Sequence, residues 1–253
     1  MIWPVALTVL GLFIGSFLNV CIHRIPRCES IVWPASHCPK CLTPIRPWDN
    51  IPVLSYLFLL GKCRSCSAKI SLRYPMVEIL SALLCISLYL RFGLSPEFLI
   101  YYVWVCILLV ITFIDLDYQI IPDSLSIGGI ILGLIAVFWL PLSYKTALIG
   151  LALGSGLLIA IIYGYYFLTK RQGMGGGDVK LLGMIGVFTG WEGVLFTIFC
   201  ASLIGSVVGV TWVIIRKKGM LAAIPFGPFL SLGAIVYVLW GAKIINWYLG
   251  YIS

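Results

Sequence analysis

Charged side chains are scarce in this chain of 253 residues: only 10% of the residues are charged, nine are acidic, and 61% are hydrophobic. The mean hydropathy is +1.08. Soluble globular domains carry about 25% charged residues, so this composition excludes a soluble globular protein. Several uncharged stretches reach the ~20 apolar residues that a helix needs to span a bilayer. The sequence therefore predicts an all-α polytopic membrane protein.

Eight apolar segments are expected to cross the membrane as helices. No small-residue cleavage site follows the first of them, so we expect that segment to be retained rather than removed as a signal peptide. The second and the sixth segments are the shortest. The predicted spans cover residues 2–22, 75–90, 96–114, 124–142, 146–168, 179–190, 194–215 and 227–248.

The formal net charge of +8 reflects topology rather than a nucleic-acid partner. In the eight-span arrangement, 14 of the 17 Lys and Arg residues fall on one side of the membrane, eight of them between residues 24 and 73. Cytoplasmic loops are enriched in Lys and Arg, so this side is predicted to be the cytoplasm and both termini are predicted to lie outside. The lipid bilayer is then the expected partner of the basic residues, and no nucleic acid is expected.

Residues 23–74 form the one long polar stretch of the sequence. The chain is therefore expected to divide into a first transmembrane helix (residues 1–22), a cytoplasmic loop domain (residues 23–74) and a transmembrane core (residues 75–253).

Two Cys-x-x-Cys pairs in the loop domain predict a structural zinc site. They are separated by 21 residues, and each tight turn can offer two thiolates, so that two turns complete a tetrahedron as in zinc ribbons. Disulfides are the alternative, but a reducing cytoplasm disfavours them. Four thiolates close the coordination sphere, so the metal would stabilise the loop domain without taking part in catalysis. The predicted ligands are Cys38, Cys41, Cys63 and Cys66.

Three of the nine acidic residues stand together after the third predicted span. Asp115 follows the apolar run directly and is expected to lie deepest in the membrane. Asp117 lies nearer the loop and is the alternative to Asp115. Asp123 precedes a predicted helix, where an aspartate can cap the free amide groups. We therefore expect Asp115 to be the functional carboxylate of this segment.

A further acidic site lies in the sequence Gly-Met-Gly-Gly-Gly-Asp-Val-Lys at residues 173–180. It places Asp178 at the edge of a membrane. Burying an ionisable side chain there costs free energy, so a functional role is the default hypothesis for such a residue. The predicted topology puts Asp178 on the same membrane face as Asp115. Two neighbouring carboxyl groups cannot both ionise easily, so one can act as a base on water while the other acts as an acid, as in aspartic proteases.

The glycines before Asp178 fit the same chemistry. A peptide substrate must lie extended beside the carboxylates, and an exposed backbone edge can pair with it as an added strand. Gly175, Gly176 and Gly177 would leave no side chain in its way. The alternative is a flexible turn between helices in which Asp178 caps the next helix, and the residues alone leave both interpretations open.

Taken together, these residues resemble the type IV prepilin peptidases, a family of integral-membrane aspartic proteases of the Gly-x-Gly-Asp type. The resemblance covers nearly the whole chain. Its motifs are Gly-Ser-Phe-Leu-Asn-Val in the first span, the paired Cys-x-x-Cys loop, Arg-Tyr-Pro at residues 73–75, Asp-x-Asp-x-x-x-Ile-Pro-Asp at residues 115–123 and Gly-Gly-Gly-Asp-Val-Lys. The resemblance implies that Asp115 and Asp178 are the catalytic pair.

The resemblance also implies an activity and a location. Members of the family hydrolyse the leaders of prepilins and pseudopilins after a glycine, usually before a phenylalanine, at the cytoplasmic face of the bacterial inner membrane. Bacterial members with the cysteine domain are expected to methylate the new amino terminus with S-adenosylmethionine as well. The sequence lacks a glycine-rich fingerprint of the Rossmann kind. The methyl-donor site is therefore implied by the resemblance only.

Four other polar residues are candidates for supporting roles. Glu78, near the start of the second span, is either part of the methyl-transfer site or an ion-pair partner of Arg73. Asn19 follows two glycines at helix-packing spacing and needs an interior partner. Lys180 is expected to help position the substrate, and it can also favour the ionised form of Asp178 or bind a lipid phosphate.

Two functions of other classes are open to the same residues. A proton-coupled transporter could use the acids as a relay. It predicts a repeat between two halves of the chain, and we find no convincing repeat. A scaffold subunit of a pilus or secretion assembly would instead use the cysteine loop as a docking module.

Overall fold

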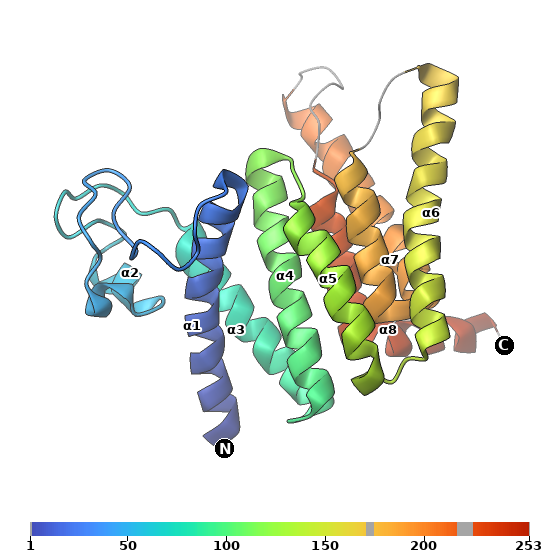
Figure 1. Cartoon of the computed structure of the whole chain (residues 1–253), viewed down its shortest axis with the longest axis horizontal. Helices are drawn as coiled ribbons and strands as arrows, with labels where there is room; N and C mark the ends of the chain where they lie inside the picture. The colour runs from blue at the N-terminus through green and yellow to red at the C-terminus, as the bar shows by residue number, and fades with distance from the viewer. Residues whose placement is uncertain (1, 171–174, 217–224, 253) are drawn as a thin grey trace. The chain divides into compact units, whose positions relative to one another are not determined.

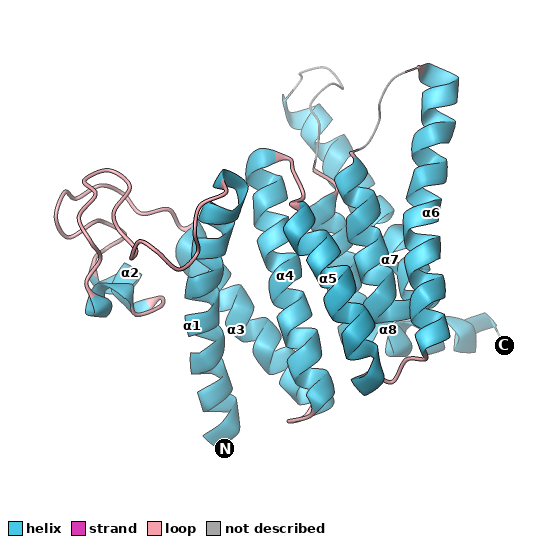
Figure 2. Cartoon of the chain, viewed as in Figure 1, coloured by secondary structure: helices cyan, strands magenta, loops and turns pink. Residues whose placement is uncertain are grey.

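The computed structural model describes residues 2–170, 175–216 and 225–252. Every secondary-structure element assigned within these ranges is a helix, as Figures 1 and 2 show. The predicted all-α fold is therefore confirmed. Gly173 and Met174, the first two residues of the glycine segment, lie outside the described residues.

The chain divides into two compact units, residues 1–110 and residues 111–253. The first unit holds α1, α2, α3 and the larger part of α4, and the second holds the end of α4 and the helices that follow. The α-helices are α1 (Ile2–Arg24), α2 (Leu54–Phe58), α3 (Arg73–Phe92), α4 (Pro96–Tyr118), α5 (Asp123–Ala136), α6 (Tyr144–Thr169), α7 (Gly176–Arg216) and α8 (Gly227–Ile252). The 3-10 helices are η1 (Ile25–Arg27), η2 (Pro47–Asn50) and η3 (Val137–Trp139).

Six helices of the described residues are long and apolar enough to cross a membrane, namely α1, α3, α4, α6, α7 and α8. The predicted span at residues 124–142 is too long. Its apolar helix covers only Asp123–Trp139, about 25 Å, which is short of the ~30 Å hydrocarbon core. It ends because Leu140 precedes a proline and has an extended backbone. The eight predicted spans thus correspond to the six long helices, the shorter α5 and a division of α7.

Gly190 divides α7 into two halves. Its backbone is non-helical, with φ 69° and ψ −174°, a conformation open mainly to glycine. A Cβ at Gly190 would stand 2.8 Å from Cγ2 of Thr146, near the start of α6. The break therefore lies level with the beginning of α6.

Both halves of α7 lie along α6. In the first half, Leu182 packs against Gly154 of α6. In the second half, Ser202 borders a cavity together with Leu158 of α6. A straight helix would carry Ser202 past the start of α6, so the chain reverses at Gly190. The separate spans predicted on either side of this position agree with the reversal.

Two glycines let α1 and α3 approach closely. A Cβ at Gly11 would stand 2.6 Å from the backbone of α3, and one at Gly15 would stand 2.5 Å from Cα of Glu78. Nδ2 of Asn19 donates a 3.1 Å hydrogen bond to the carbonyl oxygen of Tyr74. The small residues of α1 thus pack against another helix, and Asn19 has the interior partner that it needs.

Candidate functional site

Asp115 is held in place by the start of α8. It lies in the last turn of α4 and is buried, with 5% of its surface exposed. Its Oδ2 accepts a 3.0 Å hydrogen bond from the backbone N–H of Gly227. A Cβ at Gly227 would stand 2.7 Å from the same oxygen, so a residue without a side chain is needed for this close approach.

Ile121 packs against two glycines that begin other helices. A Cβ at Gly177 would stand 2.9 Å from Cβ of Ile121, and one at Gly227 would stand 3.3 Å from its Cδ1. This side chain therefore contacts the starts of α7 and α8 just beyond the end of α4. Asp178 follows Gly177 in the first turn of α7 and is half-buried. Ile121 therefore lies between the start of the helix that carries Asp178 and the glycine that holds Asp115.

Asp117 differs from Asp115 in its exposure. Successive residues of an α-helix are about 100° apart around the axis, so residues two positions apart point in nearly opposite directions. Asp115 is buried, whereas Asp117 is exposed. This arrangement favours Asp115 as the partner of Asp178.

Lys180 pairs with Asp123 at the surface. Its Nζ lies 2.6 Å from Oδ1 of Asp123 and links the second turn of α7 to the first turn of α5. The predicted capping role of Asp123 is wrong, because Pro122 occupies the N-cap position and provides no side-chain cap. The helix begins one residue earlier than a cap at Asp123 requires, and the Asp123 carboxylate is directed to the Lys180 ammonium group instead.

Gly175 and Gly176 border open space. A Cβ at Gly176 would meet no atom of the described residues within 4 Å, and one at Gly175 would reach only the backbone nitrogen of Gly177 at 4.0 Å. Of these three glycines, Gly177 alone is required by packing, through Ile121. The other two leave open space, among the described residues, next to the start of α7.

Four sulfur atoms of the loop between α1 and α3 converge. They lie within 4.8 Å of one another, and all four cysteines are free, so the disulfide alternative is not formed. The Sγ atoms of Cys38 and Cys66 are 3.8 Å apart, and those of Cys41 and Cys63 are 4.0 Å apart. A tetrahedral site with Zn–S bonds of ~2.3 Å has sulfur–sulfur distances of about 3.8 Å. The cluster therefore has the donors and the size to hold a metal ion.

The two Cys-x-x-Cys turns have the same backbone. The N–H of Leu42 donates to the carbonyl oxygen of Cys38 (2.8 Å), and the N–H of Ser67 donates to that of Cys63 (2.9 Å). Leu42 and Ser67 both adopt the left-handed region, with φ 57° and 55°. One turn is thus used twice, and each copy presents two sulfurs to the shared centre.

Hydrogen bonds favour the thiolate form at two of the cysteines. The side chain of Thr43, together with its backbone, lowers the pKa of Cys41 to about 6. The backbones of Cys66 and Ser65 lower the pKa of Cys63. Because the thiolate is the form that binds metal, these hydrogen bonds favour metal binding at Cys41 and Cys63.

Glu78 lies where α1, α3 and the loop domain meet. Its Oε2 accepts a 2.7 Å hydrogen bond from the N–H of Val53. The Oδ1 atom of Asn19 is buried without a hydrogen-bond partner among the described residues. The ion pair of Glu78 with Arg73 stays a prediction.

Sequence reasoning does not find Gly227 or Ile121 as members of the site. A signal for Gly227 exists, because Pro-Phe-Gly-Pro at residues 225–228 begins α8 with a glycine between two prolines. Ile121 is one of many apolar residues, and only its packing against Gly177 and Gly227 distinguishes it.

Two family matches cover most of the chain. Residues 9–92 match the bacterial peptidase A24 N-terminal domain, and residues 102–210 match the type IV leader peptidase family. A prepilin leader peptidase/N-methyltransferase of Pseudomonas putida is 38% identical over 262 residues, which cover 94% of this chain and 90% of that relative. The chain belongs to the type IV leader peptidase family. Both Asp115 and Asp178 lie within the second match.

Further relatives of this leader peptidase carry the same name. Those of Pseudomonas aeruginosa and Aeromonas hydrophila are 38% and 36% identical, and the matches cover 95% and 94% of this chain and 91% of each relative. No solved structure matches the chain. The predicted family is thus confirmed, and membership of a peptidase family sets aside the transporter and scaffold alternatives.

Proposed function

We propose that this leader peptidase cleaves the leaders of prepilins and pseudopilins with Asp115 and Asp178 as its catalytic pair. The observation that carries the assignment is the packing of Ile121 against both Gly177, which precedes Asp178, and Gly227, whose N–H holds Asp115 at 3.0 Å. The activity is the one named for relatives that align with 94% of the chain. Cleavage after a glycine follows from the family resemblance.

Hydrolysis is proposed to use one water molecule between the two carboxyl groups. The ionised carboxylate takes a proton from the water while the protonated carboxyl group gives its proton to the peptide oxygen, and the water oxygen bonds to the carbonyl carbon. The resulting diol then breaks its C–N bond, and a proton moves to the leaving amine. The products are a leader carboxyl group and a new amino terminus, without a covalent bond to the protein.

The N–H of Gly227 gives the two oxygens of Asp115 different tasks. Oδ2 is engaged by the backbone, so we assign proton exchange with water to Oδ1. A fixed carboxylate orientation of this kind contributes to rate because catalytic groups must be held in reactive geometry. Gly175, Gly176 and Gly177 are proposed to border the extended substrate, with Lys180 beside them.

The four-cysteine centre is proposed to hold one structural Zn²⁺. Four protein thiolates leave no open coordination position, so the ion would stabilise the loop domain (residues 23–74) that joins the first helix (residues 1–22) to the transmembrane core (residues 75–253). We propose that this domain and the carboxylates lie at the cytoplasmic face of the bacterial inner membrane, which the bias of positive charge supports.

Methylation of the new amino terminus is proposed as the second activity, as named for the relatives. S-adenosylmethionine, when bound, supplies the methyl group. Its sulfonium is cationic. The first unit offers a buried carboxylate at Glu78 and, at Oδ1 of Asn19, a buried acceptor without a partner among the described residues, so these residues fit such a ligand. We propose that both bind it, with Arg73 nearby in sequence.

The test is hydrolysis of a purified prepilin by the purified full chain in lipid nanodiscs, followed by mass spectrometry of the product. Wild type should release the leader, and a further gain of one methyl group should require S-adenosylmethionine. Asp115→Asn and Asp178→Asn should each abolish cleavage while the protein stays folded in the membrane, and Asp117→Asn should retain it. Cleavage at the wild-type rate by either of the first two variants would refute the pair.

A further inference from the structure

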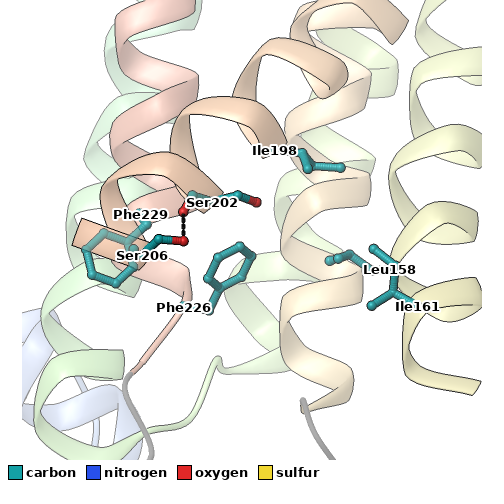
Figure 3. A pocket seen from close by; sticks show the side chains of 8 residues that line it. Leu158, Ile161, Ile198, Ser202, Ser206, Phe226 and Phe229 are labelled. Atoms are coloured by element: carbon teal, nitrogen blue, oxygen red, sulfur yellow. Dashed lines mark hydrogen bonds between the residues drawn. The ribbon is translucent and has the colours of Figure 1, made fainter. Parts of the chain in front are cut away.

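Exposed apolar side chains have two different settings in this chain. On a helix that crosses a membrane, lipid covers them; Ile161 of α6, which borders the cavity shown in Figure 3, is 49% exposed on such a helix. That cavity includes Phe226, the neighbour of Gly227, and so belongs to the proposed catalytic site. In the loop domain (residues 23–74), large apolar side chains are exposed outside the membrane-capable helices. A group of such side chains marks a surface that binds a partner.

Residues 54–60 gather several of these side chains on α2 and the turn that follows it. Phe58 is 84% exposed and Leu60 is 82% exposed. Ser55, by contrast, is buried, and its hydroxyl donates to the carbonyl oxygen of Trp48 at 3.0 Å. This short helix therefore turns its polar residue inward and its apolar residues outward, the reverse of a helix on a water-facing surface. The exposed apolar residues are Leu54, Leu57, Phe58 and Leu60.

The backbone of this segment is paired within itself. The N–H groups of Leu57, Leu59 and Gly61 donate to carbonyl oxygens four or five residues earlier, at 3.1, 2.9 and 2.9 Å. A backbone in contact with hydrocarbon must satisfy its polar groups internally, because no water is available to do so. Residues 54–60 thus combine a paired backbone with outward apolar side chains, as contact with lipid requires.

A hydrogen bond fixes the start of α2 to α3. The N–H of Val53, the N-cap residue of α2, donates to Oε2 of Glu78 at 2.7 Å. Val53 has a φ of 60°, which is rare for a β-branched residue and costs free energy. The contact with Glu78 holds this backbone and gives α2 a defined place beside α3.

Glu78 also sets the depth of α2 relative to the helices that can cross the membrane. It lies five residues after Arg73, where α3 begins. A Cβ at Gly15 of α1 would stand 2.5 Å from Cα of Glu78. Gly15 lies nine residues before Arg24, where α1 ends, about 13 Å along the helix axis. The start of α2 therefore lies alongside the ends of α1 and α3 rather than beyond them.

The charges around this segment complement the anionic surface of a membrane. Residues 23–74 carry eight Lys and Arg residues against two Asp and Glu residues. Lys62 is exposed and follows the apolar group closely, and a lysine can reach from apolar surroundings to a lipid phosphate. Trp48, which accepts the hydrogen bond of Ser55, is 61% exposed, and tryptophan is enriched at membrane interfaces. Apolar, aromatic and basic side chains thus stand together, as they do at the boundary between acyl chains and headgroups.

We infer that residues 54–60 insert into the interface of the bilayer and hold the loop domain against it. The partner is lipid: the apolar side chains enter the acyl-chain boundary, and Lys62 stays at the level of the phosphates. A second copy of the chain or another protein could cover apolar residues as well, but it would have to fit beside helices that lipid already surrounds. The inference concerns membrane binding and does not depend on the proposed peptidase activity.

Photo-crosslinking of the full chain tests this inference in nanodiscs of phosphatidylethanolamine and phosphatidylglycerol. A photoreactive amino acid in place of Phe58 should form lipid adducts several-fold more often than the same group in place of Ser65, an exposed polar residue of the second cysteine turn. Leu83 of α3, which is 59% exposed on a membrane-capable helix, is the positive control. Mass spectrometry of the labelled peptides identifies the adducts.

Each outcome decides for or against lipid. Labelling at position 58 that approaches the labelling at position 83 supports the inference. Equal lipid labelling at positions 58 and 65 overturns it, and so do adducts at position 58 with protein only, whether within the chain or with a second copy. Position 57 serves as a second probe if the variant at position 58 folds poorly, because Leu57 is exposed on the same short helix.

Discussion

The backbone N–H of Gly227 donates a 3.0 Å hydrogen bond to Oδ2 of Asp115 across 112 positions of sequence. A Cβ at Gly227 would stand 2.7 Å from this oxygen and 3.3 Å from Cγ of Asp115. The amide can therefore orient the carboxylate only from a residue that has no side chain. This contact connects the end of α4 to the start of α8 at the proposed catalytic pair.

Gly227→Ala is expected to lower kcat for leader cleavage by roughly 10- to 100-fold, because a displacement of about 1 Å in a catalytic group can cost that much. Steady-state cleavage of a prepilin in nanodiscs measures the effect. Gly250→Ala is the control on the same helix, since a Cβ at Gly250 meets no described atom within 4 Å. A wild-type kcat for Gly227→Ala would show that the amide does not orient the catalytic group.

Gly177→Ala and Gly176→Ala should differ in kind. The new Cβ at Gly177 would press on Ile121 at 2.9 Å, and overpacking of this sort costs about 1–3 kcal/mol, so Tm should fall along with kcat. The Cβ at Gly176 enters open space, so Tm should stay constant, and KM should rise if the substrate lies there. Thermal unfolding and cleavage kinetics on the same preparations separate the two outcomes. An unchanged KM for Gly176→Ala would contradict its substrate-positioning role.

Metal removal should destabilise the loop domain without reaching the catalytic pair directly. Elemental analysis of the purified chain should find one zinc ion per chain, and Cys38→Ser or Cys63→Ser should lower this content, because a tetrahedral site loses one of its four donors. Proteolysis of the loop should become faster in both variants. Cys28→Ser is the control, as that thiol lies outside the cluster. Full zinc content after both cluster substitutions would reject the assignment.

The pair of Lys180 and Asp123 should contribute little to stability. Their side chains are 40% and 61% exposed, and exposed ion pairs contribute about 0.2–1 kcal/mol. A double-mutant cycle with Lys180→Ala and Asp123→Ala should therefore give a coupling energy in that range at low salt and less at high salt. If Lys180 also positions the substrate, Lys180→Ala raises KM and Asp123→Ala does so less. Equal KM values in the two variants would assign Lys180 to the ion pair alone.

Gly190→Ala should weaken the turn between the halves of α7. The substitution forces a side chain into a left-handed backbone at φ 69° and brings its Cβ to 2.8 Å from Thr146. Each of these costs of order 1 kcal/mol or more, so Tm should fall clearly. Gly164→Ala in α6 is the control, because its Cβ meets open space and alanine favours a helix. A Tm equal to that of wild type would argue against the reversal at this position.

The predicted elements differ from the structure where local pattern competes with packing. The apolar run around residues 124–142 predicts a full span, but a proline after Leu140 ends the helix early. Asp123 is of a residue type that often caps helices, yet Pro122 occupies the N-cap position and the carboxylate of Asp123 pairs with Lys180. In both cases the responsible residue is present in the sequence. Its effect depends on neighbouring residues, which the pattern of apolar residues alone does not take into account.

The sequence by itself determined the membrane class, most of the helix positions and the motifs that carry chemistry. These follow from composition, from runs of apolar residues and from short spacings, all of which are local properties of the chain. Only the tertiary structure decided that Asp115 is buried while Asp117 is exposed, that Gly227 and Ile121 complete the site, and that four sulfurs meet within 4.8 Å. These relationships join residues far apart in sequence, and the physical reason they need the fold is that helix packing and loop closure set distances that no local pattern encodes.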